Sequence, residues 1–197
     1  MTRGCILMNR AEKLRFDVSP AFALAAALIY LLDEQGIFAL AVISAAVHEL
    51  GHYAALCIFG AKPYLLRLEL TGAAMYFDES RLSYGRELVA ALAGPIAGLM
   101  LAFAAAFCGA HALSGVSLLL SVFNLLPIGG LDGGRVLSAL LSMLLDHEQA
   151  QRICFWVTTI CAAAMLGSGI AMMLYSHSGG ALILAGGVLL IKTTGTR

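Results

Sequence analysis

Six apolar runs divide the chain, and short charged or glycine-bearing breaks separate them. An α-helix rises about 1.5 Å per residue and a bilayer core is about 30 Å thick, so about 20 apolar residues span it. The first and last runs are shorter, but they can recruit flanking residues or thin the bilayer locally. We therefore predict an all-α polytopic membrane protein with six transmembrane helices, over residues 18–32, 37–59, 88–108, 113–126, 153–175 and 181–191.

The longest polar segment, residues 61–87, separates the second and third runs. Hydrophobic and polar positions alternate in it from Tyr64 to Leu70, Thr71-Gly72 supplies a turn, and Ala73–Phe77 can return as a second strand. We predict a β-hairpin on the cytoplasmic side between the second and third helices. Its edge either pairs with an extended substrate or belongs to a purely structural loop, and the sequence leaves both interpretations open.

The fourth run cannot continue as an uninterrupted helix beyond Asn124. One proline and four glycines fall within residues 127–134, and each glycine costs about 1 kcal/mol in a helix interior. Non-helical backbone at membrane depth is tolerated only where it is buried in protein or lines a wet cavity. We predict a broken fourth helix, with helix resuming from about Gly134 to Leu145.

Small residues form a stripe along the third run, at Ala90, Gly94, Gly98, Ala102 and Ala106. A small residue at every fourth position gives a smooth helix face that permits close packing of backbones. We predict that this stripe holds the third helix against its neighbours. Pro95, inside the stripe, is expected to loosen the helix one turn earlier.

Composition and charge support a membrane protein. Of the 197 residues, 60% are hydrophobic and 12% are charged, which is too apolar for a soluble domain of this length. The net charge of zero excludes the basic footprint that nucleic-acid binding requires. With both termini in the cytoplasm, all twelve Lys and Arg residues fall on that side, which the positive-inside rule favours. We predict a multi-pass protein of the bacterial cytoplasmic membrane.

The N-terminal segment, residues 1–17, is either an amphipathic surface helix or a solvated tail. A charged region before an apolar run also resembles a signal peptide, but no A-x-A site follows Leu32, so we favour an uncleaved first helix. The five cysteines are scattered, which predicts packing and not a disulfide framework. We predict a single membrane-embedded domain, 1–197, with a hairpin-bearing loop at 61–87.

The second run contains His48-Glu49-Leu50-Gly51-His52, which places two imidazoles and a carboxylate in an apolar segment. Such groups are costly there and indicate function. His48 and His52 are four residues apart, so they share a helix face and can bind one zinc ion. Glu49, turned about 100° away on the helix, can serve as the base. The alternative is a pair of histidines that hydrogen-bond between helices.

A catalytic zinc site needs a third protein ligand, and helical depth indicates Asp132. His48 lies about 17 Å from the outer end of its run, at about 1.5 Å per residue. A similar descent along the fourth run ends at Asn124, where the helix breaks, and Asp132 follows in the irregular stretch. Asp132 can also cap the next helix, and the two roles can coexist.

Together these residues resemble the site-2 protease family, the intramembrane zinc metalloproteases of peptidase family M50. The resemblance rests on His-Glu-Leu-Gly-His at 48–52, Ala-Gly-Pro-Ile-Ala-Gly at 93–98, and Asn-Leu-Leu-Pro at 124–127 leading to Leu-Asp-Gly-Gly at 131–134. It implies one zinc ion per chain, held by His48, His52 and Asp132, with Glu49 activating a water molecule and Asn124 positioning the substrate.

Two departures from the family pattern stand out. Gly129-Gly130 lies where the family usually carries proline or bulkier residues, which predicts a more mobile loop. The chain has no room for a PDZ domain or a C-terminal CBS domain. It therefore resembles a minimal form, closest in layout to the sporulation pro-sigma-factor processing branch.

The resulting hypothesis is an intramembrane zinc metalloendopeptidase that cleaves a transmembrane or membrane-associated protein. A pro-sigma factor or other membrane-tethered transcription factor, an anti-sigma factor and a remnant signal peptide all suit it as substrates. The expected surroundings are the lipid bilayer, without nucleic acid, and a homo-oligomer is left open.

One rival hypothesis is a non-catalytic zinc-binding membrane protein, a regulator or chaperone, which would have no need of Glu49. The other is a metal transporter, which would want ionisable residues along a through-path. The first, fifth and sixth runs offer none.

Overall fold

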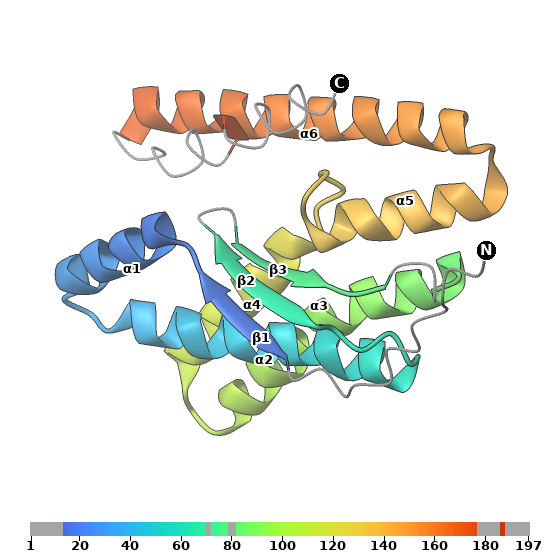
Figure 1. Cartoon of the computed structure of the whole chain (residues 1–197). Coiled ribbons are helices and arrows are strands. Elements are labelled where there is room, and N and C mark those ends of the chain that lie inside the picture. The colour runs from blue at the N-terminus through green and yellow to red at the C-terminus, as the bar shows by residue number, and fades with distance from the viewer. Residues whose placement is uncertain (1–13, 70–71, 79–81, 177–185, 188–197) are drawn as a thin grey trace.

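The computed structural model describes residues 14–69, 72–78, 82–176 and 186–187, and these are mostly helical (Figure 1). The predicted helical architecture with a small hairpin is confirmed. Residues 1–13 and most of the last apolar run, at 181–191, lie outside the described residues. The elements follow in the order β1 (Arg15–Val18), α1 (Pro20–Leu32), α2 (Ile37–Ile58), β2 (Leu65–Glu69), β3 (Gly72–Tyr76), α3 (Tyr84–Phe107), α4 (His111–Asn124), α5 (Asp132–Leu144) and α6 (His147–Ser176).

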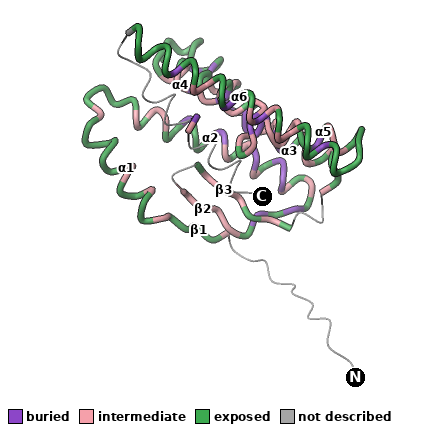
Figure 2. The backbone as a smooth tube through the Cα atoms, turned by 90° about the horizontal axis from the view of Figure 1, so that it is seen from above, coloured by how far each residue is buried: buried purple, intermediate pink, exposed green. Residues whose placement is uncertain are grey.

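Within this part of the chain, α2, α3 and α6 are long and apolar enough to cross a membrane, while α1 and α4 are apolar but shorter. Large apolar side chains cover the outside, and Phe107 and Tyr175 are 89% and 92% exposed. Polar side chains are buried instead, among them Ser44 and His48. Figure 2 shows α1 mostly exposed, with no buried residue, and buried stretches on α2 and α3. This distribution suits lipid contact and indicates an integral membrane protein.

Polar side chains cap the N-terminal ends of both α1 and α2. Ser19 caps α1, since its Oγ accepts a hydrogen bond from the Phe22 N–H at 3.1 Å. Asp33 follows α1 directly, and its carboxylate accepts from the first N–H groups of α2, those of Ile37 and Phe38, at 3.0 and 2.7 Å. A carboxylate at this position also faces the positive end of the α2 dipole.

Helix α3 lies at the centre of the bundle and packs against α2, α4 and α5. Its small residues are buried as predicted from Ala90 to Ala102, and the helix continues through Pro95. The prediction was wrong for the last residue of the stripe, because Ala106 is exposed and Ala105 is buried in its place. A four-residue repeat drifts about 40° per step against a 3.6-residue turn, so the buried face shifts back by one residue.

The predicted hairpin is present as β2 and β3, which pair antiparallel from Leu65↔Tyr76 to Glu69↔Gly72. The sheet order is β1-β2-β3, so β3 forms one edge. The side chains of Met75 and Phe77 pack on a small core at the end of α2, which includes Leu56. This contact explains why a hairpin that is marginal alone is held in place here.

Strand β1 was not predicted. Arg15–Val18 pairs parallel with β2, whereas an amphipathic helix or a solvated tail was expected for this segment, and both are wrong over these residues. The register places Asp17 opposite Arg67, and the Arg67 Nε lies 3.1 Å from the Asp17 carboxylate. Four residues of alternation are too few to indicate a strand in the sequence, so the pairing depends on β2.

The predicted break in the fourth helix is confirmed. Helix α4 ends at Asn124 and α5 begins at Asp132, two residues earlier than expected. Gly130 has a φ of 96°, a left-handed conformation that few other residues adopt. Helix α6 then returns along α5 (Figure 1). A hydrogen bond joins α6 to the segment between α4 and α5, because the buried hydroxyl of Thr158 accepts the Gly129 N–H at 2.9 Å.

Candidate metal centre

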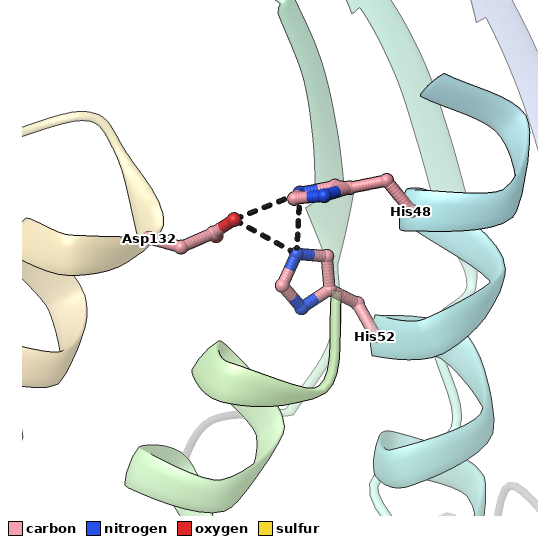
Figure 3. A group of neighbouring side chains, drawn as sticks. All are labelled: His48, His52 and Asp132. Atoms are coloured by element: carbon pink, nitrogen blue, oxygen red, sulfur yellow. Dashed lines mark hydrogen bonds and ion pairs between the residues drawn. The ribbon is translucent and has the colours of Figure 1, made fainter. Parts of the chain in front are cut away.

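Both histidines project from one face of α2 into the interior of the bundle. His48 and His52 are 4% and 6% exposed, and their Nε2 atoms lie 3.2 Å apart (Figure 3). Helix α3 leaves room for the second ring, because a Cβ at Gly94 would overlap the His52 imidazole. The two histidines therefore share one helix face, as predicted. Gly94, one residue of the small-residue stripe, leaves space for the His52 ring.

Asp132 reaches the same point from the first turn of α5 (Figure 3). Its Oδ2 lies 2.8 Å from Nε2 of His48 and 3.1 Å from Nε2 of His52. The residue that caps α5 is Leu131, so Asp132 does not serve as the N-cap. Gly133 and Gly134 follow because the carbonyls of Leu125, Leu126 and Ile128 pack on this turn, where any Cβ would overlap them.

The donor atoms of these three residues fit a bound cation. One atom from each of His48, His52 and Asp132 lies within 4.8 Å of the other two, as a site for one metal ion requires. The Nδ1–H of His52 donates to the Ala90 carbonyl at 2.8 Å. In a neutral imidazole this fixes a lone pair on Nε2, which faces the Asp132 oxygen. Two such lone pairs at this separation repel each other unless a metal ion or a proton lies between them.

Glu49 lies beside this group without joining it. Together with its neighbours it lines a cavity of about 50 Å³, which has room for a few water molecules. The cavity brings a carboxylate that is not a ligand within reach of water at the metal centre. Its walls come from α2, the edge strand β3 and α5, and consist of Glu49, His52, Leu56, Ala73, Met75, Asp132 and Arg135.

Asn124 is placed at the last turn of α4, where its Nδ2 donates to the Leu120 carbonyl at 3.0 Å. It does not line the cavity beside Glu49. The structure thus brings together His48, Glu49, His52 and Asp132 and leaves Asn124 at a separate position.

Two groups at the site had no assigned role in the sequence. The Ala90 carbonyl orients the His52 ring by a hydrogen bond, and a backbone acceptor cannot be recognised from the sequence. Arg135 lines the cavity at Glu49 and also a second cavity of about 280 Å³ beneath residues 129–130. Its position three residues after Asp132, on the same helix, was a usable signal, because such residues are neighbours on a helix surface.

Comparison with known proteins gives sequence relatives for this arrangement. The sequence model of Peptidase family M50 matches residues 110–168, which include Asn124 and Asp132. The zinc metalloprotease MJ0392 of Methanocaldococcus jannaschii is 31% identical over 150 residues. The match covers 70% of this chain and 43% of that protein, so the chain spans somewhat less than half the length of this relative.

The fold is also found among solved structures. The site-2 protease from Methanocaldococcus jannaschii superposes with a TM-score of 0.71 and 22% sequence identity, over 92% of this chain and 90% of that chain. The family expected from the motifs and the family found by comparison agree. The chain is a relative of the zinc metalloproteases of peptidase family M50 and has the site-2 protease fold.

Proposed function

We propose that this chain is an intramembrane zinc metalloendopeptidase that cleaves a transmembrane or membrane-associated protein. The observation that carries the proposal is the convergence of His48, His52 and Asp132 beside a water-sized cavity that Glu49 lines. Two imidazoles and one carboxylate form a ligand set typical of catalytic zinc. A structural zinc site would be closed by a fourth ligand and would have no use for the nearby base.

Each residue then has a role in peptide hydrolysis. Zinc, when bound, supplies Lewis-acid chemistry that activates water and polarises a carbonyl. Glu49 takes a proton from the attacking water and delivers it to the leaving amine, as the new C–O bond forms and the C–N bond breaks. His52 is held in the ligating tautomer by the Ala90 carbonyl. Asn124, one helix away, positions the substrate backbone where α4 ends.

The edge strand β3 supports a path for an extended substrate. A helical substrate hides its carbonyl groups in its own hydrogen bonds, so it must unwind before it is cut. Ala73 and Met75 of β3 line the cavity with Glu49, and β3 has a strand neighbour on only one side among the described residues. Pairing with this free edge would hold the unwound segment beside the metal centre.

Water can reach the site from the side of the broken helix. Arg135 lines both the cavity at Glu49 and the larger second cavity, which Glu87 and the glycines of the break also line. In the proposed topology this end faces the cytoplasm. The proposed topology has six membrane spans in the bacterial cytoplasmic membrane, with both termini in the cytoplasm. Residues 1–197 form a single catalytic domain.

The proposed position of the site in the membrane suits substrates that carry a membrane segment. A pro-sigma factor, an anti-sigma factor or a remnant signal peptide would each present a membrane segment to the site. Comparing membrane proteomes of cells with the active chain and with its Glu49→Gln variant would identify the substrate as the protein that accumulates uncleaved.

The Glu49→Gln substitution tests the mechanism itself. It keeps the side-chain shape and leaves the three ligands intact, so one zinc ion per chain should stay bound. Cleavage of a co-expressed membrane substrate should fall by about 10²–10⁴-fold, because the proton-transferring group is lost. Glu148→Gln, at an exposed position at the start of α6, is the matched control. Undiminished cleavage by Glu49→Gln would refute the assigned role.

A further inference from the structure

Three buried hydroxyl groups lie between α2 and α4, on the outer side of the histidines. Ser44, Ser117 and Ser121 are all fully buried. The Ser44 and Ser117 hydroxyls lie 2.7 Å apart, and the Ser44 hydroxyl also donates to the Leu40 carbonyl at 2.8 Å. The Ser121 hydroxyl donates to the Ser117 carbonyl at 2.8 Å. Burying a hydroxyl costs stability unless it is bonded, and each of these three has a hydrogen-bond partner.

His48, one turn after Ser44, has a buried atom without a partner. Its Nδ1 is enclosed and finds no hydrogen-bond partner among the described residues, while its Nε2 faces Asp132. If Nε2 binds a metal, Nδ1 carries the proton and must donate it. His52 already meets this requirement through the Ala90 carbonyl, and His48 has no equivalent anchor.

Gly98 on α3 connects the two observations. A Cβ at this position would overlap the Ser121 hydroxyl and would lie 3.8 Å from Nδ1 of His48. The serine oxygen and the unpaired nitrogen therefore flank the same glycine. Since the Ser121 proton already points at the Ser117 carbonyl, the remaining lone pairs of its Oγ are available as acceptors.

We propose that Ser121 is a positioning residue for His48. In the zinc-loaded chain its Oγ accepts the Nδ1–H of His48, either through one buried water or after a small turn of the ring, and so fixes the ring with Nε2 toward Asp132. The missing side chain at Gly98 gives the hydroxyl the space to do this. The inference rests on the proposed function in one respect, which is that His48 ligates the metal through Nε2.

The test compares two serines on one helix face. Ser121→Ala removes the acceptor. Ser117→Ala removes a hydroxyl that is equally buried one turn away but keeps the backbone carbonyl that orients Ser121. The full chain is purified in detergent, stripped of metal and titrated with zinc against a chromophoric chelator. Ser121→Ala should bind zinc about 10–100-fold more weakly, Ser117→Ala should match wild type, and Ser121→Thr should restore affinity.

A second measurement needs no substitution to be informative. Nitrogen-15 NMR of the histidine side chains in the zinc-loaded chain should show a protonated His48 Nδ1 that exchanges slowly with solvent. The same proton should exchange faster in Ser121→Ala. This readout also covers the case in which Ser121→Ala does not fold.

The outcomes separate the two proposals. Failure of the wild-type chain to bind zinc would overturn the proposed function and this inference with it. Tight zinc binding by wild type and Ser121→Ala alike would overturn the inference alone. An equal loss in Ser117→Ala would also overturn it, because the effect would then belong to any buried cavity on α4.

Discussion

Substituting Gly94 by alanine should disrupt the metal centre from a helix that contributes no ligand. The added Cβ would overlap Nε2 of His52 and would lie 2.5 Å from Cε1 and 2.6 Å from Cδ2, whereas real Cβ atoms essentially never come within 3.0 Å of other atoms. The ring or α3 must therefore move by more than about 0.5 Å. Metal–ligand distances tolerate only about 0.2 Å, so the required shift is more than twice the tolerance.

The expected loss of zinc affinity in Gly94→Ala exceeds that of a lost outer hydrogen bond. Removing a group that merely orients a ligand costs about 10–100-fold. Displacing a ligand should cost more than about 100-fold, which corresponds to more than about 2.7 kcal/mol. The His52 ring cannot simply rotate away, because its Nδ1–H would then lose the Ala90 carbonyl.

Gly167→Ala provides the matched control on α6. Gly167 lies in a helix interior, and beyond its own helix turn no atom of the described residues lies within 4 Å of the Cβ position there. Alanine at an open helical site should stabilise the chain by about 0.5–1 kcal/mol. Both variants would be purified in detergent, titrated with zinc against a chelator, and melted without metal. Zinc affinity of Gly94→Ala within threefold of wild type would refute the packing argument.

Two further predictions concern the break in the fourth helix and the metal itself. Thr158→Val should lower the free energy of unfolding by about 1–3 kcal/mol, because the Gly129 N–H loses its buried acceptor. Thr159→Val is the control for thermal unfolding, since the Thr159 hydroxyl bonds only the Phe155 carbonyl of its own helix; equal losses would contradict the role of Thr158. Free zinc at about 100 times its dissociation constant should stabilise the wild-type chain by about 2.7 kcal/mol, seen as a higher melting temperature. The same zinc should not raise the melting temperature of His52→Ala, and an equal rise would place the metal elsewhere.

The grouping of the three proposed ligands could be predicted from the sequence because it follows from helix geometry. His48 and His52 share a face in any helix, so knowing that residues 37–58 are helical was sufficient. Asp132 required one more step, the matching of depths along two helices that are expected to cross the same layer. That step works in a membrane protein because the bilayer gives parallel helices a common depth scale. The glycines after Asp132 indicated the break in the helix. They are required because no side chain fits against the carbonyl groups that pack there.

The parts that could not be predicted depend on contacts between distant segments. Strand β1 exists because residues 65–69 present a free edge to it, and four residues carry too little pattern to reveal a parallel partner across two helices. The shift from Ala106 to Ala105 follows from the drift of a four-residue repeat over several turns. The orientation of His52 depends on a backbone carbonyl, which every residue possesses and no sequence distinguishes.

Helix α3 supplies no ligand and no base, yet it sets the positions of groups on both neighbouring helices. Its carbonyl at Ala90 fixes the tautomer of one histidine, its Gly94 admits that ring, and its Gly98 admits the Ser121 hydroxyl beside the other histidine. In a bilayer, close helix packing depends on small residues, so this face would be expected from packing alone. What packing alone does not explain is that two of its glycines face polar atoms of the metal centre. The small residues of α3 therefore do more than allow helices to pack, because they also leave room for the side chains of the site. The four-residue spacing of Gly94 and Gly98 matches the four-residue spacing of His48 and His52 on α2.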